Sequence, residues 1–317
     1  MHIYLVTAVL AFGTTYLITP LVKKLALKIN AIDVPNDRKI HSEPIARLGG
    51  LGIWAGFFLS VIVGFLLAQA TGSKLDFHVG WGILLAGTLL MVVGMVDDIR
   101  GLRATTKLIF QIIATMIVIY FGVEINFLSN PFNGIIAIGS FAIPLTLLWV
   151  VGVTNAMNLI DGLDGLATGV TAISSITLFF VALRTHQIGA AILLLALASA
   201  SLAFLRYNFS PAKIFLGDSG SLLLGFVLAT AATIGVLKTT LVVAMIVPIL
   251  ILGVPIFDTL WAIGRRLGSG QHPFKADNKH IHHLLLRAGF SQREAVLAIY
   301  TACFILSFIA LVMALQK

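Results

Sequence analysis

Long apolar runs separated by short polar stretches make up most of the chain. Ten runs are long enough, or nearly so, for a membrane-spanning helix, which needs about 20 mostly apolar residues. They cover residues 3–22, 49–69, 79–96, 107–122, 135–153, 166–183, 187–205, 220–236, 240–262 and 295–315. The stretch 154–165 is polar enough for a loop or an interfacial helix. The pattern therefore predicts ten membrane spans, or eleven if that stretch also crosses.

The composition changes this picture little. Hydrophobic residues make up 59% of the 317 positions and charged residues 11%, whereas a soluble domain carries roughly 25% charged residues. Mean hydropathy is +1.03. We expect an all-α polytopic integral membrane protein that forms one transmembrane domain over residues 1–317. The single cysteine, Cys303, excludes an intrachain disulfide and a cysteine metal cluster.

The charged residues gather on one side of the predicted bundle. If connections alternate between two sides, seventeen lysines and arginines fall on one side and four on the other. The positive-inside rule makes the first side cytoplasmic and places both termini outside. Lys23 and Lys24 follow the first run, a pattern typical of a retained helix rather than a cleaved signal peptide. Eleven of the thirteen acids, all but Asp76 and Glu124, share the cytoplasmic side, which that rule does not require.

Five cytoplasmic loops are predicted at about 23–48, 97–106, 154–165, 206–219 and 263–294. The second begins with two adjacent carboxylates, Asp97 and Asp98, in "VDDIRGL", and Arg103 and Lys107 follow. Like charges side by side repel, and ionised groups near a bilayer are costly. We therefore expect this pair to hold a cation or a polar substrate.

The third and fourth loops carry oxygen-rich side chains. A polar stripe with a spacing of three residues is formed by Asn155, Asn158, Asp161 and Asp164. It could line one face of a helix or form Asx turns at a helix end. In "FLGDSGS", Asp218 could be a helix N-cap, or could offer an oxygen to Mg²⁺ beside amides that bind phosphate. Phe215 could stack on a base or pack into the membrane.

The fifth and first loops carry histidines and cations. In "HIHH", His280, His282 and His283 lack the spacing of a zinc site, which favours a phosphate-binding surface over zinc. The first loop could contact phosphate or act as a plain juxtamembrane basic segment, through Arg38, Lys39, His41 and Arg47.

Asp258 lies inside a predicted span, where an acid suggests function by default; structural pairing with Arg265 or Arg266 is the alternative. A proton-coupled transporter would use such acids as relay groups. Such a transporter needs polar groups reachable from both sides, whereas these cluster on one face. Carboxylates, amides and cations on one membrane surface instead suit a magnesium-bound polyphosphate.

Five motifs follow one another between about Asp33 and His283: "VDDIRGL" with Lys107 after it, "NAMNLIDGLDGLA", "FLGDSGS", "PIFDT" and "HIHH". In this order they resemble the polyprenyl-phosphate N-acetylhexosamine-1-phosphate transferases, the family that includes WecA, TagO and the muramoyl-pentapeptide enzyme MraY. "PIFDT", and "HIHH" in place of a three-histidine run, resemble the WecA and TagO branch.

The resemblance implies ten or eleven helices in a bacterial inner membrane, a cytoplasmic active site, and Mg²⁺, with Mn²⁺ as an alternative. The implied reaction moves N-acetylglucosamine 1-phosphate from UDP-N-acetylglucosamine to undecaprenyl phosphate and releases UMP. It would begin a cell-envelope polysaccharide such as teichoic acid, O-antigen or common antigen; the muramoyl-pentapeptide donor is the alternative. The resemblance also suggests a homodimer, and no nucleic-acid partner is expected.

Residue roles follow from the resemblance by position. Asp218 would be the principal Mg²⁺ ligand and Asn158 a second one. Asp97 and Asp98 would lie at the lipid phosphate, with Lys107 contacting phosphate. Further phosphate contacts are expected from Arg38, Lys39, His41, Arg47 and Arg103. The nucleotide-sugar side would comprise Asn155, Asp161, Asp164, Phe215, His280, His282 and His283.

Two reaction schemes are compatible with these residues. A phosphate monoester has its second pKa near about 6, so the acceptor is largely dianionic at neutral pH and needs no strong base. It could attack the sugar-bearing phosphorus in line, with Asp97 orienting it and taking any residual proton. Alternatively, an aspartate could first form a covalent phospho-enzyme. The sequence leaves both schemes open.

Overall fold

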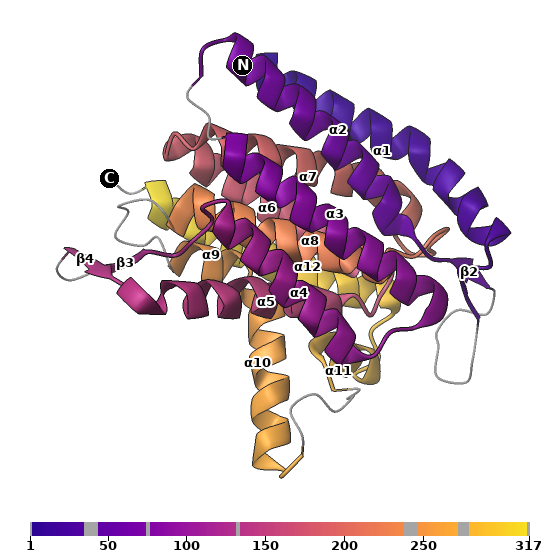
Figure 1. The fold of residues 1–317 in the computed structure, drawn as a ribbon. Coiled ribbons are helices and arrows are strands. Elements are labelled where there is room, and N and C mark those ends of the chain that lie inside the picture. Colours follow the sequence, from indigo (N-terminus) through magenta and orange to yellow (C-terminus); the bar gives the residue numbers. More distant parts are fainter. Residues whose placement is uncertain are drawn as a thin grey trace.

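A computed structural model describes residues 2–34, 44–73, 77–130, 134–237, 246–271 and 279–315 of the protein. Nine helices in these ranges form a bundle (Figure 1). They are α1 (His2–Lys28), α2 (Gly49–Ala70), α3 (Phe77–Arg100), α4 (Ala104–Tyr120), α5 (Ala142–Ile160), α6 (Leu166–Arg184), α7 (Ile188–Asn208), α8 (Gly217–Ala232) and α12 (Gln292–Leu315). The other helical segments are η1 (Gly139–Phe141), η2 (Thr233–Leu237), α9 (Ile246–Ile251), α10 (Gly253–Gly268) and α11 (Ile281–Arg287).

The prediction of an all-α polytopic membrane protein is confirmed. Within the described ranges, eight helical segments are long and apolar enough to cross a membrane, and α4 is a shorter apolar helix. These nine coincide with nine of the ten predicted spans. Two small antiparallel sheets were not predicted: β1 (Ile32–Asp33) with β2 (Ile45–Ala46), and β3 (Phe127–Asn130) with β4 (Gly134–Ala137).

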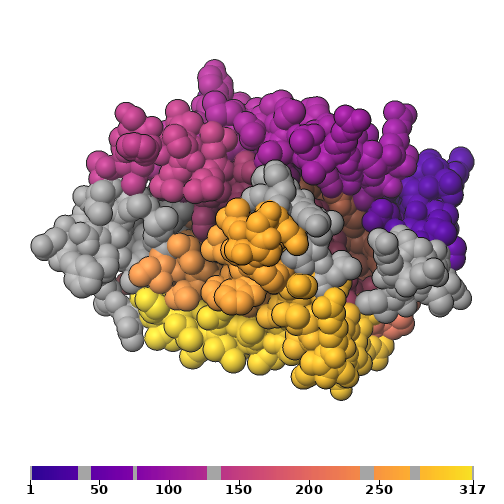
Figure 2. Space-filling view, turned by 90° about the horizontal axis from the view of Figure 1, so that it is seen from below, coloured from indigo at the N-terminus to yellow at the C-terminus, as the bar shows by residue number. Residues whose placement is uncertain are grey.

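The remaining predicted span, 240–262, differs from the prediction. Its first residues lie outside the described ranges, and the rest forms two helices, α9 and α10, separated at Leu252. Pro255 lacks an amide hydrogen, and its ring would clash with the carbonyl of Ile251 in a continuous helix. The chain therefore changes direction, and α10 projects away from the bundle (Figures 1 and 2).

Two of the predicted loops are shorter than expected because helices continue into them. Asp97 and Asp98 lie in the last turn of α3, and Asn155 and Asn158 lie near the end of α5. The polar stripe of the third loop is therefore partly helical, and Asp161 is the C-cap residue of α5. These carboxylates and amides are consequently held on rigid helix ends.

The most buried helix of the bundle is α8. Within its spanning window 94% of the residues are buried, against 28% for α1 and for α12. Its sequence is rich in glycine, alanine and serine, and small residues let helix backbones approach closely in membranes. The N-terminus of α8 lies at the end of the bundle where α3 turns into α4, and both chain termini lie at the opposite end (Figure 1).

Candidate active site

The site is built around the N-terminus of α8. Leu216 occupies the N-cap position and has no polar side chain to satisfy the first amides of the helix. Asp98 of α3 takes that role, because its Oδ1 accepts from the Asp218 amide at 2.8 Å and its Oδ2 from the Ser219 amide at 3.1 Å. Asp218 is therefore a residue of the first helical turn, and its interpretation as an N-cap is wrong. Its carboxylate can serve another purpose.

Three glycines allow this close approach. A Cβ on Gly94 of α3 would lie 2.4 Å from the Ser219 amide nitrogen, and one on Gly50 of α2 would lie 2.1 Å from that of Gly220. Gly217 has a φ of +72°, and a Cβ there would meet the Asp98 carboxylate. The N-terminus of α8 is thus packed directly against α2 and α3.

A lysine joins the two other carboxylates. Lys107, in the first turn of α4, donates from Nζ to Asp218 Oδ2 at 2.5 Å and to Asp97 Oδ2 at 3.3 Å. The Asp97 and Asp218 carboxylates also interact directly. Asp97 Oδ1 accepts from the Leu102 amide at 2.6 Å, which holds the turn between α3 and α4. This arrangement concentrates negative charge around one ammonium group.

The end of α5 contributes amide groups. Asn158 donates from Nδ2 to Ser221 Oγ at 2.8 Å and also interacts with the Asp218 carboxylate. Asn155 forms a reciprocal amide pair with Gln111 of α4, with nitrogen–oxygen distances of 2.6 and 3.4 Å. Asn158 thus lies at the carboxylate cluster, whereas the Asn155 side chain is already paired.

Asp161 adds a further acid to this end of the bundle. Asp161 is half-buried. Burial raises the pKa of the Asp161 carboxyl well above its usual range, and the charges of Asp218 and Asp98 raise it further, while Arg47 opposes them. Like-charged carboxylates thus destabilise one another here, which favours binding of a cation.

The segment before α8 is fixed by backbone contacts. Phe215 donates its amide to the Ala46 carbonyl of β2 at 2.8 Å, and its carbonyl accepts from the Gly49 amide at 3.0 Å. Asp164 Oδ2 accepts from the Ala212 amide at 2.9 Å. Asp164 therefore stabilises this segment, and Phe215 is held beside the start of α2.

The histidines form a second cluster on α11. His280 Nδ1 lies 2.7 Å from Asp258 Oδ2, and Asp258 Oδ1 accepts from the Ile281 amide at 2.8 Å. Pairing of Asp258 with Arg265 or Arg266 was the structural alternative from the sequence; the contacts of Asp258 are instead with His280, the N-cap residue of α11, and with Ile281 of that helix. The break between α9 and α10 sets the direction of α10, and therefore the place of Asp258.

His282 connects the histidine cluster to the third loop. A Cβ on Gly162 would lie 2.2 Å from His282 Nε2, so only glycine fits at position 162 beside this imidazole. Burial, together with the neighbouring His283 and His280, lowers the pKa of the His282 imidazole to about 4. His282 is thus neutral near pH 7, and it packs against Gly162, the residue that follows Asp161 in the sequence.

The predicted phosphate-binding cations are only partly described. Arg38, Lys39 and His41 lie outside the described residues. Arg47 follows β2, and its Nε lies 3.6 Å from Asp33 Oδ1. Arg103 is exposed at the N-cap of α4, four residues before Lys107.

The donors around Asp218 fit a magnesium ion. In the part of the chain that the structure describes, no three His, Cys, Asp or Glu side chains are arranged as a metal centre. Mg²⁺ usually takes one or two carboxylates and completes its octahedron with phosphate oxygens and water. Asp218, beside Asn158 and with Asp97 in contact, offers such a partial ligand set.

Gln111 and Ser221 are the site residues that sequence reasoning missed. Gln111 lies four residues after Lys107, a spacing that places both on one face of α4, and this spacing was the available signal. Ser221 stands at the end of the quoted "FLGDSGS" motif. Their partners, Asn155 and Asn158, lie far away in the sequence, so the pairing itself could not be predicted.

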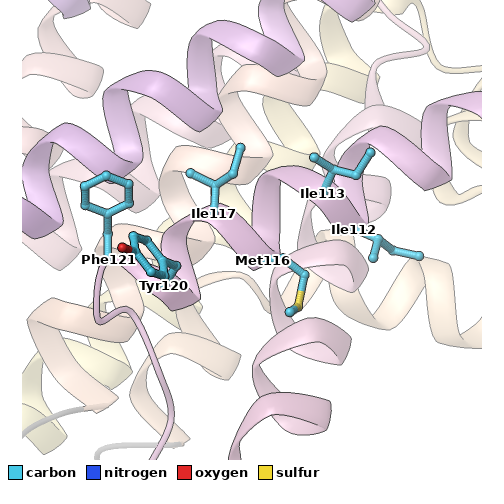
Figure 3. A pocket seen from close by; sticks show the side chains of 6 residues that line it. All are labelled: Ile112, Ile113, Met116, Ile117, Tyr120 and Phe121. Carbon is cyan, nitrogen blue, oxygen red and sulfur yellow. The ribbon is translucent and has the colours of Figure 1, made fainter.

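The other face of α4 is apolar. A shallow cavity of about 390 Å³ is lined by Ile112, Ile113, Met116, Ile117, Tyr120 and Phe121 (Figure 3). These side chains carry no ionisable group except the Tyr120 phenol, so the cavity offers no phosphate-binding chemistry. It matches a membrane-facing surface, whereas Lys107 and Gln111 face the site.

Comparison with known proteins agrees with the motifs. The model of the glycosyl transferase family 4 matches residues 80–236. A probable undecaprenyl-phosphate N-acetylglucosaminyl 1-phosphate transferase of Bacillus subtilis is 40% identical, over 97% of this chain and 84% of its own. A decaprenyl-phosphate N-acetylglucosaminephosphotransferase of Mycobacterium tuberculosis H37Rv is 38% identical, over 90% of this chain and 76% of its own.

An undecaprenyl-phosphate alpha-N-acetylglucosaminyl 1-phosphate transferase of Escherichia coli K12 is 30% identical, over 90% of this chain and 77% of its own. The similarity therefore extends over nearly the whole bundle, including the helices outside residues 80–236. Together with the order of the motifs, it shows that the chain belongs to glycosyl transferase family 4.

Proposed function

We propose that the protein transfers N-acetylglucosamine 1-phosphate from UDP-N-acetylglucosamine to undecaprenyl phosphate, producing undecaprenyl-diphosphate-N-acetylglucosamine and UMP. The observation that carries the proposal is the contact of Lys107 with Asp97 and Asp218, where α3, α4 and α8 meet at one end of a membrane bundle. The names of the relatives support the donor and the lipid acceptor. These names favour UDP-N-acetylglucosamine over the muramoyl-pentapeptide nucleotide as the donor.

In the proposed reaction, an oxygen of the lipid phosphate attacks the sugar-bearing phosphorus of the donor. The bond from that phosphorus to the bridging oxygen breaks, and UMP leaves with the bond's electron pair. Phosphoryl transfer of this kind depends mainly on positioning and on neutralising charge. Lys107 would exchange its carboxylate contacts for phosphate oxygens, and Asp97 would orient the acceptor and take any residual proton.

We assign the metal to the carboxylate of Asp218 with help from Asn158. A bound Mg²⁺ supplies Lewis-acid stabilisation of the diphosphate and of the departing UMP. Asp98 is assigned a positioning role, because both its oxygens accept from the first amides of α8. It orients Asp218 without touching the reacting atoms.

The nucleotide side of the site is assigned to the neighbouring segments. Asp161 and Phe215 border the cluster from the end of α5 and the start of α8, and His282 of α11 lies against Gly162. Arg47 and Arg103 would contribute positive charge, with Arg38, Lys39 and His41. We assign this end of the bundle to the cytoplasmic face of a bacterial inner membrane, an assignment that the positive-inside rule supports.

The test uses purified protein in detergent with undecaprenyl phosphate, Mg²⁺ and labelled UDP-N-acetylglucosamine. We expect UMP and lipid-linked sugar in equal amounts, and neither product without the lipid phosphate. UMP release without acceptor would favour a phospho-enzyme or hydrolysis. Turnover of the muramoyl-pentapeptide donor in place of UDP-N-acetylglucosamine would assign the other branch, and no turnover with either donor would contradict the proposal.

A further inference from the structure

A second cavity, bordered by three lysines, lies on the outside of the bundle. It has a volume of about 280 Å³ and lies where the end of α1, the end of α7 and the segment before α8 meet. Its lining includes Lys23, Lys24, Lys213, Tyr207, Pro20 and Leu27. It is distinct from the carboxylate cluster, whose side chains do not line it.

The cavity is bordered by three positive charges and, among the residues that the structure describes, by no acid. None of its three lysines forms an ion pair with any residue that the structure describes. Lys24 and Lys213 are exposed and Lys23 is half-buried, so three like charges lie around one cavity at the protein surface and repel one another. An anion in the cavity would remove this cost.

The apolar wall of the cavity continues along α1. Pro20 and Leu27 line it, and Leu17 and Leu21, on the same helical face, are 70% and 61% exposed. Only 28% of the spanning window of α1 is buried, so this face contacts the bilayer. Tyr207 packs on Tyr16 with ring centroids 5.5 Å apart, and tyrosines are common at the membrane–water interface. The three lysines of the cavity therefore lie next to an apolar stripe of α1 that faces lipid.

We propose that this cavity binds the headgroup of an anionic phospholipid of the inner leaflet, with its acyl chains along Leu17 and Leu21 of α1. Basic pockets between membrane helices on the cytoplasmic side suit such headgroups. Lys213 also lies two residues before Phe215, whose backbone is bonded to Ala46 and Gly49. A bound headgroup would thus contact, on its outer side, the segment that precedes Asp218.

The experiment measures phospholipid binding to delipidated full-length protein in detergent by native mass spectrometry, with melting temperature as a second readout. The probes are phosphatidylglycerol, phosphatidylcholine, undecaprenyl phosphate and inorganic phosphate. We expect phosphatidylglycerol to bind and to raise the melting temperature, and phosphatidylcholine to do neither. The triple variant Lys23→Gln, Lys24→Gln, Lys213→Gln should weaken phosphatidylglycerol binding by about a hundredfold, since each lysine near a membrane surface contributes about 1 kcal/mol.

The matched control replaces the same three lysines with arginine, which retains the charge and should retain binding. Lys28→Gln removes one charge from α1 outside the cavity and should leave binding unchanged. Equal binding of both phospholipids, or unchanged binding by the glutamine variant, would overturn the proposal. So would stabilisation by inorganic phosphate equal to that by phosphatidylglycerol, or selective binding of undecaprenyl phosphate alone. None of these readouts depends on the transferase activity.

Discussion

Asp98 and Asp258 perform the same structural task in two regions with different chemistry. Each accepts from the first amides of a helix that it does not belong to, Asp98 at α8 and Asp258 at α11. The residues at the two N-cap positions, Leu216 and His280, make no capping hydrogen bond of their own. An aspartate from elsewhere in the chain thus completes each helix.

The surroundings of the two caps differ. Around Asp98 lie further carboxylates, with Lys107 as the bridging cation between Asp97 and Asp218. Around Asp258 lie imidazoles, and His282 is neutral near pH 7. The first region therefore favours a metal and phosphates, whereas the second offers the neutral imidazole of His282 against Gly162. The same capping device thus occurs beside a carboxylate cluster and beside a histidine cluster.

The largest effect is expected from Asp218→Asn. Removing this charge should lower turnover by about a thousandfold, because electrostatic stabilisation is the main contribution to such a reaction. The melting temperature should fall only slightly, since the amide oxygen can still accept from Lys107 while one of several clustered carboxylates is removed. The control, Glu294→Gln, changes an exposed acid at the start of α12 that is bonded to Ser291 and should retain both properties.

Gly94→Ala tests whether α8 must pack directly on α3. The added Cβ would lie 2.4 Å from the Ser219 amide nitrogen, so the helices must separate. We expect a stability loss of about 1–3 kcal/mol and roughly a hundredfold loss of turnover through the displacement of Asp218. Gly152→Ala on α5 is the control, since a Cβ there meets nothing within 4 Å. Equal behaviour of the two variants would refute the packing argument.

Asp98→Asn separates positioning from catalysis. The amide retains one acceptor oxygen, so α8 keeps part of its cap, and we expect a loss of about 1 kcal/mol in stability. Turnover should fall about tenfold, with a larger effect on kcat than on KM. The measurement is steady-state kinetics alongside thermal unfolding. A fall in turnover as deep as that of Asp218→Asn, without any fall in melting temperature, would instead make Asp98 a catalytic residue.

The pair in the histidine region can be tested by a double-mutant cycle. Asp258→Asn and His280→Gln should each lower the melting temperature, and the double variant should lower it by less than their sum. The expected coupling is about 0.5–3 kcal/mol, as for residues in direct contact. Additive effects would mean that the 2.7 Å contact contributes nothing to stability.

The last prediction concerns the pH dependence of stability rather than turnover. The pKa of His282 is lowered to about 4, against about 6.5 in an unfolded chain. The unfolded state therefore binds more protons between these values, and stability falls as pH drops from about 6.5 toward 4. The loss between pH 7 and pH 5 should be about 2 kcal/mol. In His282→Phe the melting temperature should depend less on pH over that range; an unchanged dependence would exclude this histidine as its cause.

The apolar runs predicted the bundle because length and hydropathy alone decide which segments cross a membrane. They did not predict where helices end, since α3 and α5 carry polar residues through their last turns. The break between α9 and α10 had a local signal in Pro255. The direction of α10, and hence the Asp258–His280 contact, depends on packing that a linear pattern does not contain.

The sequence predicted which residues belong to the candidate site but not all of their contacts, because contacts also depend on packing. Asp97, Lys107 and Asp218 were identified from residue type and motif order, and the structure brings them together. Asp98 was grouped with Asp97 because the two are adjacent in sequence. On a helix, however, neighbours point in directions about 100° apart, so one faces Lys107 and the other the amides of α8. Chemistry could be read from the sequence, but the division of roles required the geometry.

The central claim is that the cluster around Asp218 holds a divalent cation together with the donor's diphosphate. Electron paramagnetic resonance of Mn²⁺, added with UDP to the purified protein, tests it most directly. The account predicts a bound Mn²⁺ signal with coupling to phosphorus, at least about tenfold weaker binding in Asp218→Asn, and unchanged binding in Glu294→Gln. Equal Mn²⁺ affinity and equal phosphorus coupling in Asp218→Asn and the unsubstituted protein would contradict it.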